Sequence, residues 1–459
     1  MKAASKIFRA NDIRGVYKKD FDLSFCKGLA TSLSYLLKKD LAVASPKVLI
    51  GYDARLSSPK IGASLIEALL KEGVDVCCIG IAPSPLCYFL LHHYNLAATV
   101  VITASHNPPE DNGFKFLFHE RLGAKATLLR IKKIYFENNL PKTKSLRGRL
   151  FEIDSTTPYI QSLKEEFSLK AIPFVVDTGN GALGPLAQKV FHSFKLFPQF
   201  LGLKPDGHFP NHHPDPTVEE NLEDLKQAVC ASSAAFGVSF DGDGDRLVLV
   251  TSKGKTVLGD ELAYLFLPSL LEKQKSSNLH LPLVADVKCS DWLFQFIKKE
   301  GGEVILSQSG HRLTRKTMKE NKGLAAFEFS GHIFFDDRPN RGFDDALYAC
   351  LRVLELLQNG ATLENLLPSI KTSRTKEIRL PLDPQQISLK LKNIRNYLEA
   401  KKETFVDIDG IRISRKTSWA LIRKSQTQDA LTLRFEASNK EDLLNLKKEC
   451  FSVLKIPLS

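Results

Sequence analysis

The 459-residue sequence predicts an α/β protein, with three similar mixed-sheet α/β domains and a smaller α+β C-terminal domain around a central cleft. Two observations lead to this fold class. A strand, helix, strand pattern occurs three times along the chain, and from about Ser373 it gives way to closely spaced strands around two helical stretches. The length agrees, because a chain of this size exceeds what one hydrophobic core usually organises.

Each repeat begins with a short apolar strand that ends in an aspartate and a loop. These first strands lie at 47–55, 173–181 and 282–290. Helical patterns follow at 59–72, 184–192 and 291–300. Second strands come next, at 74–80, 195–201 and 302–307. Because such units connect strands through a crossover helix, each repeat predicts a mixed or parallel sheet covered on both faces.

Each repeat then reaches a third strand that ends in an unusual polar loop. The third strands lie at 97–102, 234–240 and 323–327, and the loops at 103–108, 241–246 and 328–332. In open α/β sheets, ligands gather outside the strand ends. The three loops are therefore expected to line one cleft, each with a different chemistry.

The C-terminal part has a different pattern. Short strands at 376–380, 410–414, 419–423 and 430–435 surround helical patterns at 383–401 and 440–454. This arrangement predicts a fourth, α+β domain. We expect the domains to span residues 1–153, 154–255, 256–370 and 371–459.

Composition narrows the class of protein. With 43% hydrophobic and 25% charged residues, the chain resembles ordinary globular proteins. No apolar run reaches the roughly 18 residues of a membrane span, and the first residues lack the apolar core and cleavage site of a signal peptide. The eight cysteines show no metal-binding spacing and lie mostly in apolar stretches. A cytoplasmic protein without a membrane partner is expected.

The net charge of +12 bears on the partner. A basic excess of this size is compatible with nucleic acid, a membrane surface or anionic small molecules. The basic residues are spread in short clusters, and no nucleic-acid-binding module is recognisable. An anionic metabolite is therefore expected rather than nucleic acid, with a solvated basic surface as the alternative.

The segment 241–246, Asp-Gly-Asp-Gly-Asp-Arg, carries the most specific signal. Asp241, Asp243 and Asp245 alternate with glycines, so a tight loop can turn three carboxylates towards one hard cation. Mg²⁺ is favoured because it takes oxygen ligands and uses few protein carboxylates. Ca²⁺ is the rival ion, but the twelve-residue Ca²⁺ loop with its distant glutamate is absent. Arg246 adjoins the loop, and a solvated acidic turn is the structural alternative.

Ser105 ends a β-branched strand, beside His106 and before a Pro-Pro break that restricts the backbone. Alone, such a serine is usually part of a turn. Beside an acidic metal loop, a phosphorylated serine would supply an anionic oxygen to the metal and act as phosphoryl donor. Lys115 and Arg14 are candidates to contact the phosphate or serve as acid or base, with surface ion pairs as the alternative.

These motifs occur in the order seen in the α-D-phosphohexomutases, and the chain most resembles the bacterial phosphomannomutase/phosphoglucomutase branch. The stretches that carry the resemblance are 8–15, 103–108, 241–246, 286–290, 309–311, 328–332 and 423–436. The resemblance implies that Ser105 is phosphorylated and binds Mg²⁺ through its phosphate, together with Asp241, Asp243 and Asp245. It also implies a set of residues around the transferring phosphoryl group: Arg14, His106, Lys115 and Arg246. In this set Lys115 is a general acid/base candidate, and His332 is a second one.

Sugar and phosphate recognition also follow from the resemblance. Lys288 and His311 would approach the reacting end of the sugar, and Glu328 and Ser330 would hold its hydroxyls. The residues that would hold the non-reacting phosphate are Arg423, Ser425, Gln426 and Thr427. The sequence departs from the family pattern at Asn11, Phe327, Phe329 and Gln426, which bears on sugar preference and phosphate affinity rather than on the reacting groups.

Residues and resemblance together predict a phosphohexomutase that interconverts hexose 1-phosphate and hexose 6-phosphate, of mannose, glucose or both. The resemblance implies an active-site phosphoserine and a 1,6-bisphosphate intermediate, with glucose 1,6-bisphosphate or mannose 1,6-bisphosphate as activator. A monomer or a dimer is expected. Two alternatives stay open: phosphoglucosamine mutase, which shares the serine and metal loops, and a non-catalytic sugar-phosphate-binding protein.

Overall fold

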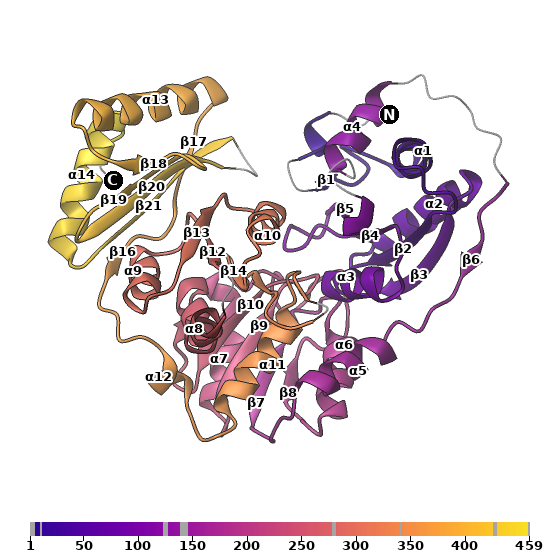
Figure 1. The fold of residues 1–459 in the computed structure, drawn as a ribbon, viewed down its shortest axis with the longest axis horizontal. Helices are drawn as coiled ribbons and strands as arrows, with labels where there is room; N and C mark the ends of the chain where they lie inside the picture. Colours follow the sequence, from indigo (N-terminus) through magenta and orange to yellow (C-terminus); the bar gives the residue numbers. More distant parts are fainter. Residues whose placement is uncertain are drawn as a thin grey trace. The chain divides into compact units, whose positions relative to one another are not determined.

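The chain forms two compact units in the computed structural model (Figure 1). One unit contains residues 1–258 and 330–366, and the other contains residues 259–329 and 367–459. The structure describes residues 5–9, 12–122, 127–137, 146–277, 281–339, 341–425 and 429–457.

The first sheet contains six strands and packs with four helices. The strands are β1 (Ile13–Val16), β2 (Lys47–Tyr52), β3 (Asp75–Ile81), β4 (Ala98–Ile102), β5 (Asp111–Phe118) and β6 (Leu150–Phe151), and the helices are α1 (Leu23–Tyr35), α2 (Ser58–Lys71), α3 (Ser84–His93) and α4 (Leu128–Glu137). The strand order is β1-β5-β4-β2-β3-β6. Val48 and Leu49 point to opposite faces of β2 and both are fully buried, because α1, α2 and α4 share one core with the sheet while α3 also contacts β2 and β4.

The second sheet has the order β11-β10-β9-β7-β8. Its strands are β7 (Phe174–Asp177), β8 (Gln199–Leu201), β9 (Phe236–Phe240), β10 (Leu247–Thr251) and β11 (Thr256–Val257), with helices α5 (Thr157–Glu166), α6 (Gly184–Ser193) and α7 (Glu223–Cys230). The segment 330–366 adds β15 (Ile333–Phe335), α11 (Ala346–Leu357) and α12 (Leu363–Leu366) to this unit. Strand β7 pairs in parallel with β8 and β9, and β10 is the antiparallel hairpin partner of β9.

The second unit begins with a third sheet of the same plan. Strand β12 (Leu283–Asp286) pairs in parallel with β13 (Val304–Ser307) and β14 (Ala325–Phe327). The accompanying helices are α8 (Gly259–Ser276), α9 (Asp291–Lys299) and α10 (His311–Glu320). In all three sheets the first strand of the repeat therefore lies between the second and the third, as β2 lies between β3 and β4. The predicted threefold repeat is confirmed.

The remaining sheet of the second unit is antiparallel. Its strands are β16 (Ser373–Arg374), β17 (Ile378–Pro381), β18 (Phe405–Val406), β19 (Ile411–Ser414), β20 (Ser418–Lys424) and β21 (Ala430–Ala437), with helices α13 (Pro384–Ala400) and α14 (Lys440–Leu454). Both helices share one hydrophobic core with β19, β20 and β21. Asp383 and Gln386 form a capping box that begins α13. The predicted α+β domain is confirmed.

Short helical turns complete the described elements. They are the 3₁₀ helices η1 (Ser5–Ile7), η3 (Glu120–Leu122) and η4 (Glu219–Leu222), and the π-helical turn η2 (Leu36–Asp40).

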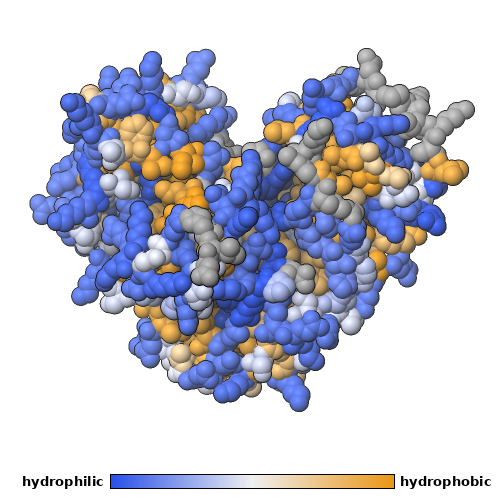
Figure 2. All heavy atoms as spheres, viewed as in Figure 1, coloured by the Kyte–Doolittle hydropathy of each residue, from blue (hydrophilic) through white to orange (hydrophobic). Residues whose placement is uncertain are grey.

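Hydrophilic residues cover most of the face shown in Figure 2, and hydrophobic residues form smaller groups among them. Exposed apolar side chains of this kind are common on folded chains. Among the described residues, no helix combines the length and the apolar character that crossing a membrane requires.

The loop after β7 is held by an aspartate and a histidine. Asp177 Oδ1 accepts from the backbone N–H of Gly179, and Asp177 Oδ2 lies 2.8 Å from His212 Nε2. Burial disfavours a charged imidazole here, but the hydrogen bond and the charge of Asp177 outweigh burial and raise the pKa of His212 above its usual value of 6.5.

This pair predicts a pH-dependent contribution to stability. Because the folded state raises the pKa of His212, the contribution is fully present below the unfolded-state value and is lost as the pH rises through the folded-state value. We expect His212→Asn to lower the free energy of unfolding by about 1 kcal/mol more at pH 5.5 than at pH 8.5. Urea denaturation followed by circular dichroism measures this difference. His208→Asn, at an exposed histidine paired with Asp206, is the control; an equal loss at both pH values for His212→Asn would contradict the prediction.

Candidate functional site

Three neighbouring strands bring the predicted phosphate-handling residues of the first sheet together. Arg14 lies on β1, Lys115 on β5, and Ser105 follows β4; these strands are adjacent in the order β1-β5-β4. Lys115 is paired with Val101 across the β4–β5 ladder. Arg14 reaches the serine loop, where its Nη1 donates to Asn107 Oδ1 at 2.8 Å.

Arg55 organises the backbone of the serine loop. Its fully buried guanidinium donates to the carbonyl oxygens of residues 105, 107, 108 and 111, and its Nε donates to Asp53 Oδ2 at 2.9 Å. Asp53 also accepts from Ser58 Oγ at 2.7 Å at the start of α2. An arginine provides five donors in a fixed plane, so one side chain can hold several carbonyl groups at once.

Ser105 has a left-handed backbone, with a φ of 52°. This region is unfavourable for residues other than glycine and is often found at functional sites. The conformation is supported because the Ser105 N–H donates to Thr103 Oγ1 at 2.7 Å and Arg55 binds the Ser105 carbonyl at 2.9 Å. The hydroxyl donates to Asp241 Oδ2 at 2.8 Å and lies 3.2 Å from His106 Nδ1.

The three aspartates lie in the tight turn between β9 and β10 and are fully buried. One carboxylate oxygen from each of Asp241, Asp243 and Asp245 lies within 4.8 Å of the others. The two glycines of the turn have different roles. A side chain at Gly242 would approach the Ser105 carbonyl oxygen to 2.7 Å, and Gly244 has a φ of +74°, which favours glycine.

The residues of this turn fit a divalent cation. Oδ1 of Asp243 and Oδ1 of Asp245 are buried, and neither has a hydrogen-bond partner in the described part of the chain. Lys115 Nζ lies 2.7 Å from Asp243 Oδ2 and 2.5 Å from Asp245 Oδ2. Burial and the neighbouring Asp243 carboxylate raise the pKa of Asp245, because carboxylates placed this close together repel one another when charged. A hard cation with oxygen ligands is the natural counter-charge.

Cations surround the serine and its acidic partners. Burial alone would lower the pKa of Lys115, but Asp243 and Asp245 raise it well above the usual lysine value, so its amine is protonated in this arrangement. Burial, Arg246 and Arg14 hold the pKa of His106 well below 6.5, so its imidazole is neutral. The site therefore presents fixed cations beside a neutral imidazole.

Arg246 and His332 complete this cluster within the first unit. Arg246 Nε donates to Asp241 Oδ2 at 3.0 Å, and Arg246 forms an isolated β-bridge with His332. His332 Nδ1 lies 2.8 Å from Asp344 Oδ2 and 3.7 Å from Asp245 Oδ1. Ser330, the remaining predicted residue of this unit, lies two residues before His332 in the same loop.

The second unit holds another group of predicted residues. Glu328 follows β14, and its Oε1 accepts from the Gly310 N–H at 3.0 Å and from Thr314 Oγ1 at 2.6 Å. His311 begins α10 directly after Gly310. Lys288 follows β12, and its Nζ lies 3.8 Å from Asp286 Oδ2. The three strand ends of this sheet thus bring Lys288, His311 and Glu328 into one loop region.

Arg423, near the end of β20, belongs to the same unit. Its Nη2 forms an ion pair with Asp409 Oδ2 at 2.7 Å, and that oxygen also accepts from the Ser309 N–H at 3.2 Å. Asp409 thereby connects Arg423 to the loop that precedes His311. Ser425 follows β20, whereas Gln426 and Thr427 lie outside the described residues, as does Asn11.

Two departures from the family pattern have clear places in the fold. Phe327 is fully buried at the end of β14. The ring of Phe329 is covered by the Arg434 guanidinium, whose central carbon lies 3.6 Å from the ring centroid. Arg434 also donates to the Lys288 carbonyl oxygen at 2.6 Å. Phe329 is therefore anchored beside Glu328 by a cation–π contact.

Sequence reasoning missed several residues that support the site. Arg55 and Asp53 belong to the predicted first strand and its loop, without a role of their own. The available signal was an aspartate and an arginine directly after an apolar strand. Ser84, at the start of α3, donates through Oγ to Asp243 Oδ2 at 2.5 Å, and Asp344 binds His332. No local pattern marks these two: Ser84 and Asp243 are 159 residues apart, and Asp344 contacts His332 from 12 positions further along the chain, beyond β15.

The Arg55 contacts predict that the serine loop loosens in Arg55→Lys. A lysine has one compact ammonium group and cannot span the same carbonyl oxygens. We expect the amides of residues 103–107, 110 and 111 to exchange at least about tenfold faster, which corresponds to ~1.4 kcal/mol of lost protection. Hydrogen–deuterium exchange of peptides from this loop measures the effect. Arg147→Lys, at an exposed ion pair with Glu67, is the control, and unchanged exchange in Arg55→Lys would contradict the assigned role.

Comparisons with known proteins agree with this arrangement. Three family models match the chain, described as phosphoglucomutase/phosphomannomutase alpha/beta/alpha domains I, II and III, at residues 5–142, 157–254 and 258–372. A phosphomannomutase/phosphoglucomutase of Pseudomonas aeruginosa is 32% identical over 446 residues, which cover 96% of this chain and 94% of that protein. A phosphoglucomutase of Neisseria gonorrhoeae is 32% identical over 98% of this chain and 96% of its own.

A solved structure extends the agreement to the whole fold. The crystal structure of a phosphoglucomutase/phosphomannomutase family protein from Burkholderia thailandensis matches with a TM-score of 0.86 and 30% identity. The match covers 99% of both chains. The predicted resemblance is confirmed. The chain belongs to the phosphoglucomutase/phosphomannomutase family of phosphohexomutase enzymes.

Proposed function

We propose that the protein interconverts the 1-phosphate and 6-phosphate of a hexose, mannose or glucose or both, through a phosphorylated Ser105. The observation that carries this proposal is the Ser105 hydroxyl 2.8 Å from Asp241 in a turn of three buried aspartates. The family and the names of its relatives, which include phosphomannomutase and phosphoglucomutase, support the sugar phosphate as substrate.

Asp241, Asp243 and Asp245 would hold Mg²⁺, with an oxygen of the phosphorylated serine. When bound, the ion supplies positive charge that offsets the charge of the phosphoryl group during transfer. The fit rests on three carboxylates in one buried turn and on the two Oδ1 atoms that lack hydrogen-bond partners among the described residues.

The chain's own residues would position the group and move the proton. In the first half-reaction, a sugar hydroxyl oxygen bonds to phosphorus, the bond from phosphorus to Ser105 Oγ breaks, and the hydroxyl proton passes to a base. His332, oriented by Asp344, is our candidate base. Lys115, which is protonated in this arrangement, suits stabilisation of the departing Ser105 oxygen. The 1,6-bisphosphate then reorients and returns its other phosphate to Ser105.

Arg14, His106 and Arg246 would steady the phosphoryl group during transfer, because they converge on the serine loop and its acidic partner. A sugar bisphosphate, glucose 1,6-bisphosphate or mannose 1,6-bisphosphate, would load the serine before the first turnover.

Recognition of the sugar phosphate is assigned to further loops. We place Lys288 and His311 at the reacting end of the sugar, and Glu328 and Ser330 at its hydroxyls. A carboxylate that accepts and a hydroxyl that accepts or donates suit a polyhydroxy ligand. The non-reacting phosphate is assigned to Arg423, Ser425, Gln426 and Thr427. The guanidinium of Arg423 supports this role, because its planar donors match phosphate oxygens.

Phosphoglucosamine mutase is the alternative within the family, and a non-catalytic sugar-phosphate-binding protein is the alternative outside it. Turnover of mannose 1-phosphate, glucose 1-phosphate and glucosamine 1-phosphate separates the first from our proposal. The complete serine and aspartate constellation favours catalysis over simple binding.

We also propose domain boundaries near residues 153, 255 and 370. The matched family models support these positions: one model gives way to the next between residues 142 and 157 and between 254 and 258, and the third ends at 372.

All eight cysteines are free, which supports a reducing cytoplasmic setting. A monomer or dimer remains the prediction for the assembly.

The phosphoserine proposal is tested by intact mass. Incubation with glucose 1,6-bisphosphate and Mg²⁺ should add one phosphate to the protein, and Ser105→Ala should take up none while its mutase activity falls by more than about a thousandfold. Ser276→Ala, at an exposed serine that ends α8, is the matched control and should behave as wild type. Phosphate uptake or near-normal turnover by Ser105→Ala would contradict the mechanism.

A second prediction concerns Arg423. Because a charge-assisted hydrogen bond to phosphate is worth ~1.5–3 kcal/mol, we expect Arg423→Ala to raise KM by about ten- to a hundredfold with a smaller change in kcat. Steady-state kinetics measure both. Asp409→Asn removes the ion pair but keeps the Arg423 guanidinium. It therefore distinguishes the loss of phosphate binding from the loss of the ion pair. An equal rise in KM for both variants would assign Arg423 a structural role instead.

A further inference from the structure

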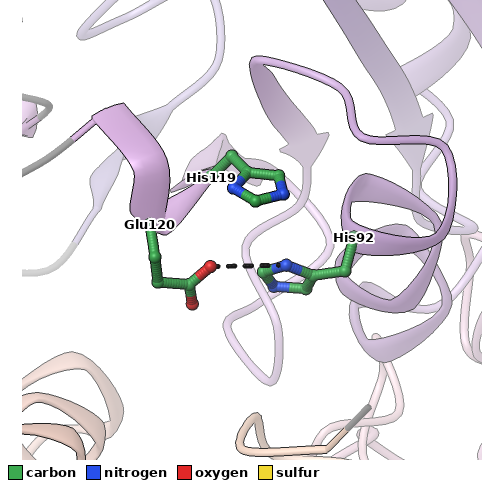
Figure 3. A group of neighbouring side chains, drawn as sticks. All are labelled: His92, His119 and Glu120. Carbon is green, nitrogen blue, oxygen red and sulfur yellow. Dashed lines mark ion pairs between the residues drawn. The ribbon is translucent and has the colours of Figure 1, made fainter.

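A second group of potential metal ligands lies in the first unit, apart from the aspartate turn. Figure 3 shows the group, which consists of His92, His119 and Glu120. His92 belongs to the last turn of α3, His119 directly follows β5, and Glu120 begins η3. One ligand atom from each side chain lies within 4.8 Å of the others. None of the three belongs to the proposed catalytic residues.

We propose that His92, His119 and Glu120 bind a transition-metal ion of the zinc class. His92 Nδ1 and Glu120 Oε2 are 3.3 Å apart. Two ligands of a tetrahedral Zn²⁺, each bonded at about 2.0 Å, are separated by roughly the same distance. The two imidazole rings are inclined by 62° with centroids 5.1 Å apart, and one donor atom from each of the three side chains lies within 4.8 Å of the others.

Backbone hydrogen bonds hold the segment that carries His119, and an aromatic ring packs on His92. The His119 N–H donates to the Ala97 carbonyl oxygen at 3.1 Å, and the His119 carbonyl oxygen accepts from the Leu122 N–H at 2.9 Å. The ring of Phe343 stacks on His92 with an interplanar angle of 10° and also contacts Tyr88 of α3 edge-on. The ligands therefore come from a rigid helix end and a rigid strand end, which reduces the cost of ordering them.

The donor set distinguishes this group from the aspartate turn. Imidazole with carboxylate suits Zn²⁺, Co²⁺ and Ni²⁺, whereas a set of carboxylate oxygens suits Mg²⁺. The side chains of His92 and Glu120 are 24% and 48% exposed, so an ion has access from solvent. Metal binding would replace the proton between His92 Nδ1 and Glu120 Oε2, release it to water, and connect α3 to the end of β5. A stabilising rather than catalytic ion is expected there.

The test is metal binding by the full-length protein with Mg²⁺ in excess, so that the aspartate turn is saturated. We expect equilibrium dialysis to show one Zn²⁺ fewer per chain in His92→Ala/His119→Ala than in wild type. Co²⁺ should give visible absorption bands in wild type that this variant lacks. Zn²⁺ should also raise the melting temperature of wild type more than that of the variant.

Matched variants make the result decisive. His208→Ala removes an exposed histidine with one carboxylate partner, Asp206, and should bind as wild type. Glu120→Gln keeps the shape of the side chain and serves if the double variant folds poorly; we expect its affinity for Zn²⁺ to fall at least about tenfold. Equal Zn²⁺ uptake and equal Co²⁺ spectra in wild type and both site variants would overturn the proposal, as would the absence of bound Zn²⁺ in wild type. Mutase activity with Mg²⁺ should be unchanged in all variants.

Discussion

Three buried carboxylates in one turn form the constraint on which the first unit depends. Asp241, Asp243 and Asp245 are each fully buried, and buried charges are costly unless they are paired. The Lys115 ammonium, the Arg246 guanidinium and the Ser105 hydroxyl contact these carboxylates. Arg246 belongs to the turn itself, whereas Lys115 and Ser105 come from the first sheet. The negative charge of the turn is therefore balanced by groups from both sheets of this unit.

The serine loop meets this charge through a backbone that other parts of the fold hold in place. Ser105 has a left-handed conformation, and Arg55 binds the carbonyl groups of Ser105 itself and of Asn107. Gly242 allows the acidic turn to approach the Ser105 carbonyl without a side chain between them. Close contact of two backbones, rather than reach of long side chains, therefore sets the distance from hydroxyl to carboxylate.

Much of the fold was predictable because each repeat has a recognisable local sequence pattern. An apolar strand, a helix and a second strand follow in order, and the first strand lies between the others in all three sheets. The predicted strands 410–414 and 419–423 correspond to β19 and β20. The two-residue strands β6, β11, β16 and β18 were missed, since so short a segment has no periodicity of its own and is defined by its neighbour. The longer strands β1, β5, β10 and β15 were also missed, because the repeat of strand, helix and strand does not include them.

In the candidate site, too, some residues stand out in the local sequence and others are defined only by their neighbours in the fold. Ser105 and the three aspartates stand out in the sequence because each motif is compact. Arg55, Ser84 and Asp344 do not, because their importance arises from contacts across the fold, such as the bond from Ser84 to Asp243. Sequence patterns identify groups that carry chemistry, whereas the residues that hold those groups become visible only with tertiary contacts.

The hydrogen bond from Ser105 to Asp241 joins residues 136 positions apart, which has a consequence for biosynthesis. The ribosome synthesises Ser105 well before it synthesises the acidic turn, and domains generally fold as they emerge. The first sheet can therefore form with its serine exposed to bulk water and without an acidic partner. The hydroxyl and its acidic partner therefore meet only after the second sheet has been made and packs against the first, so the first sheet on its own holds an incomplete site.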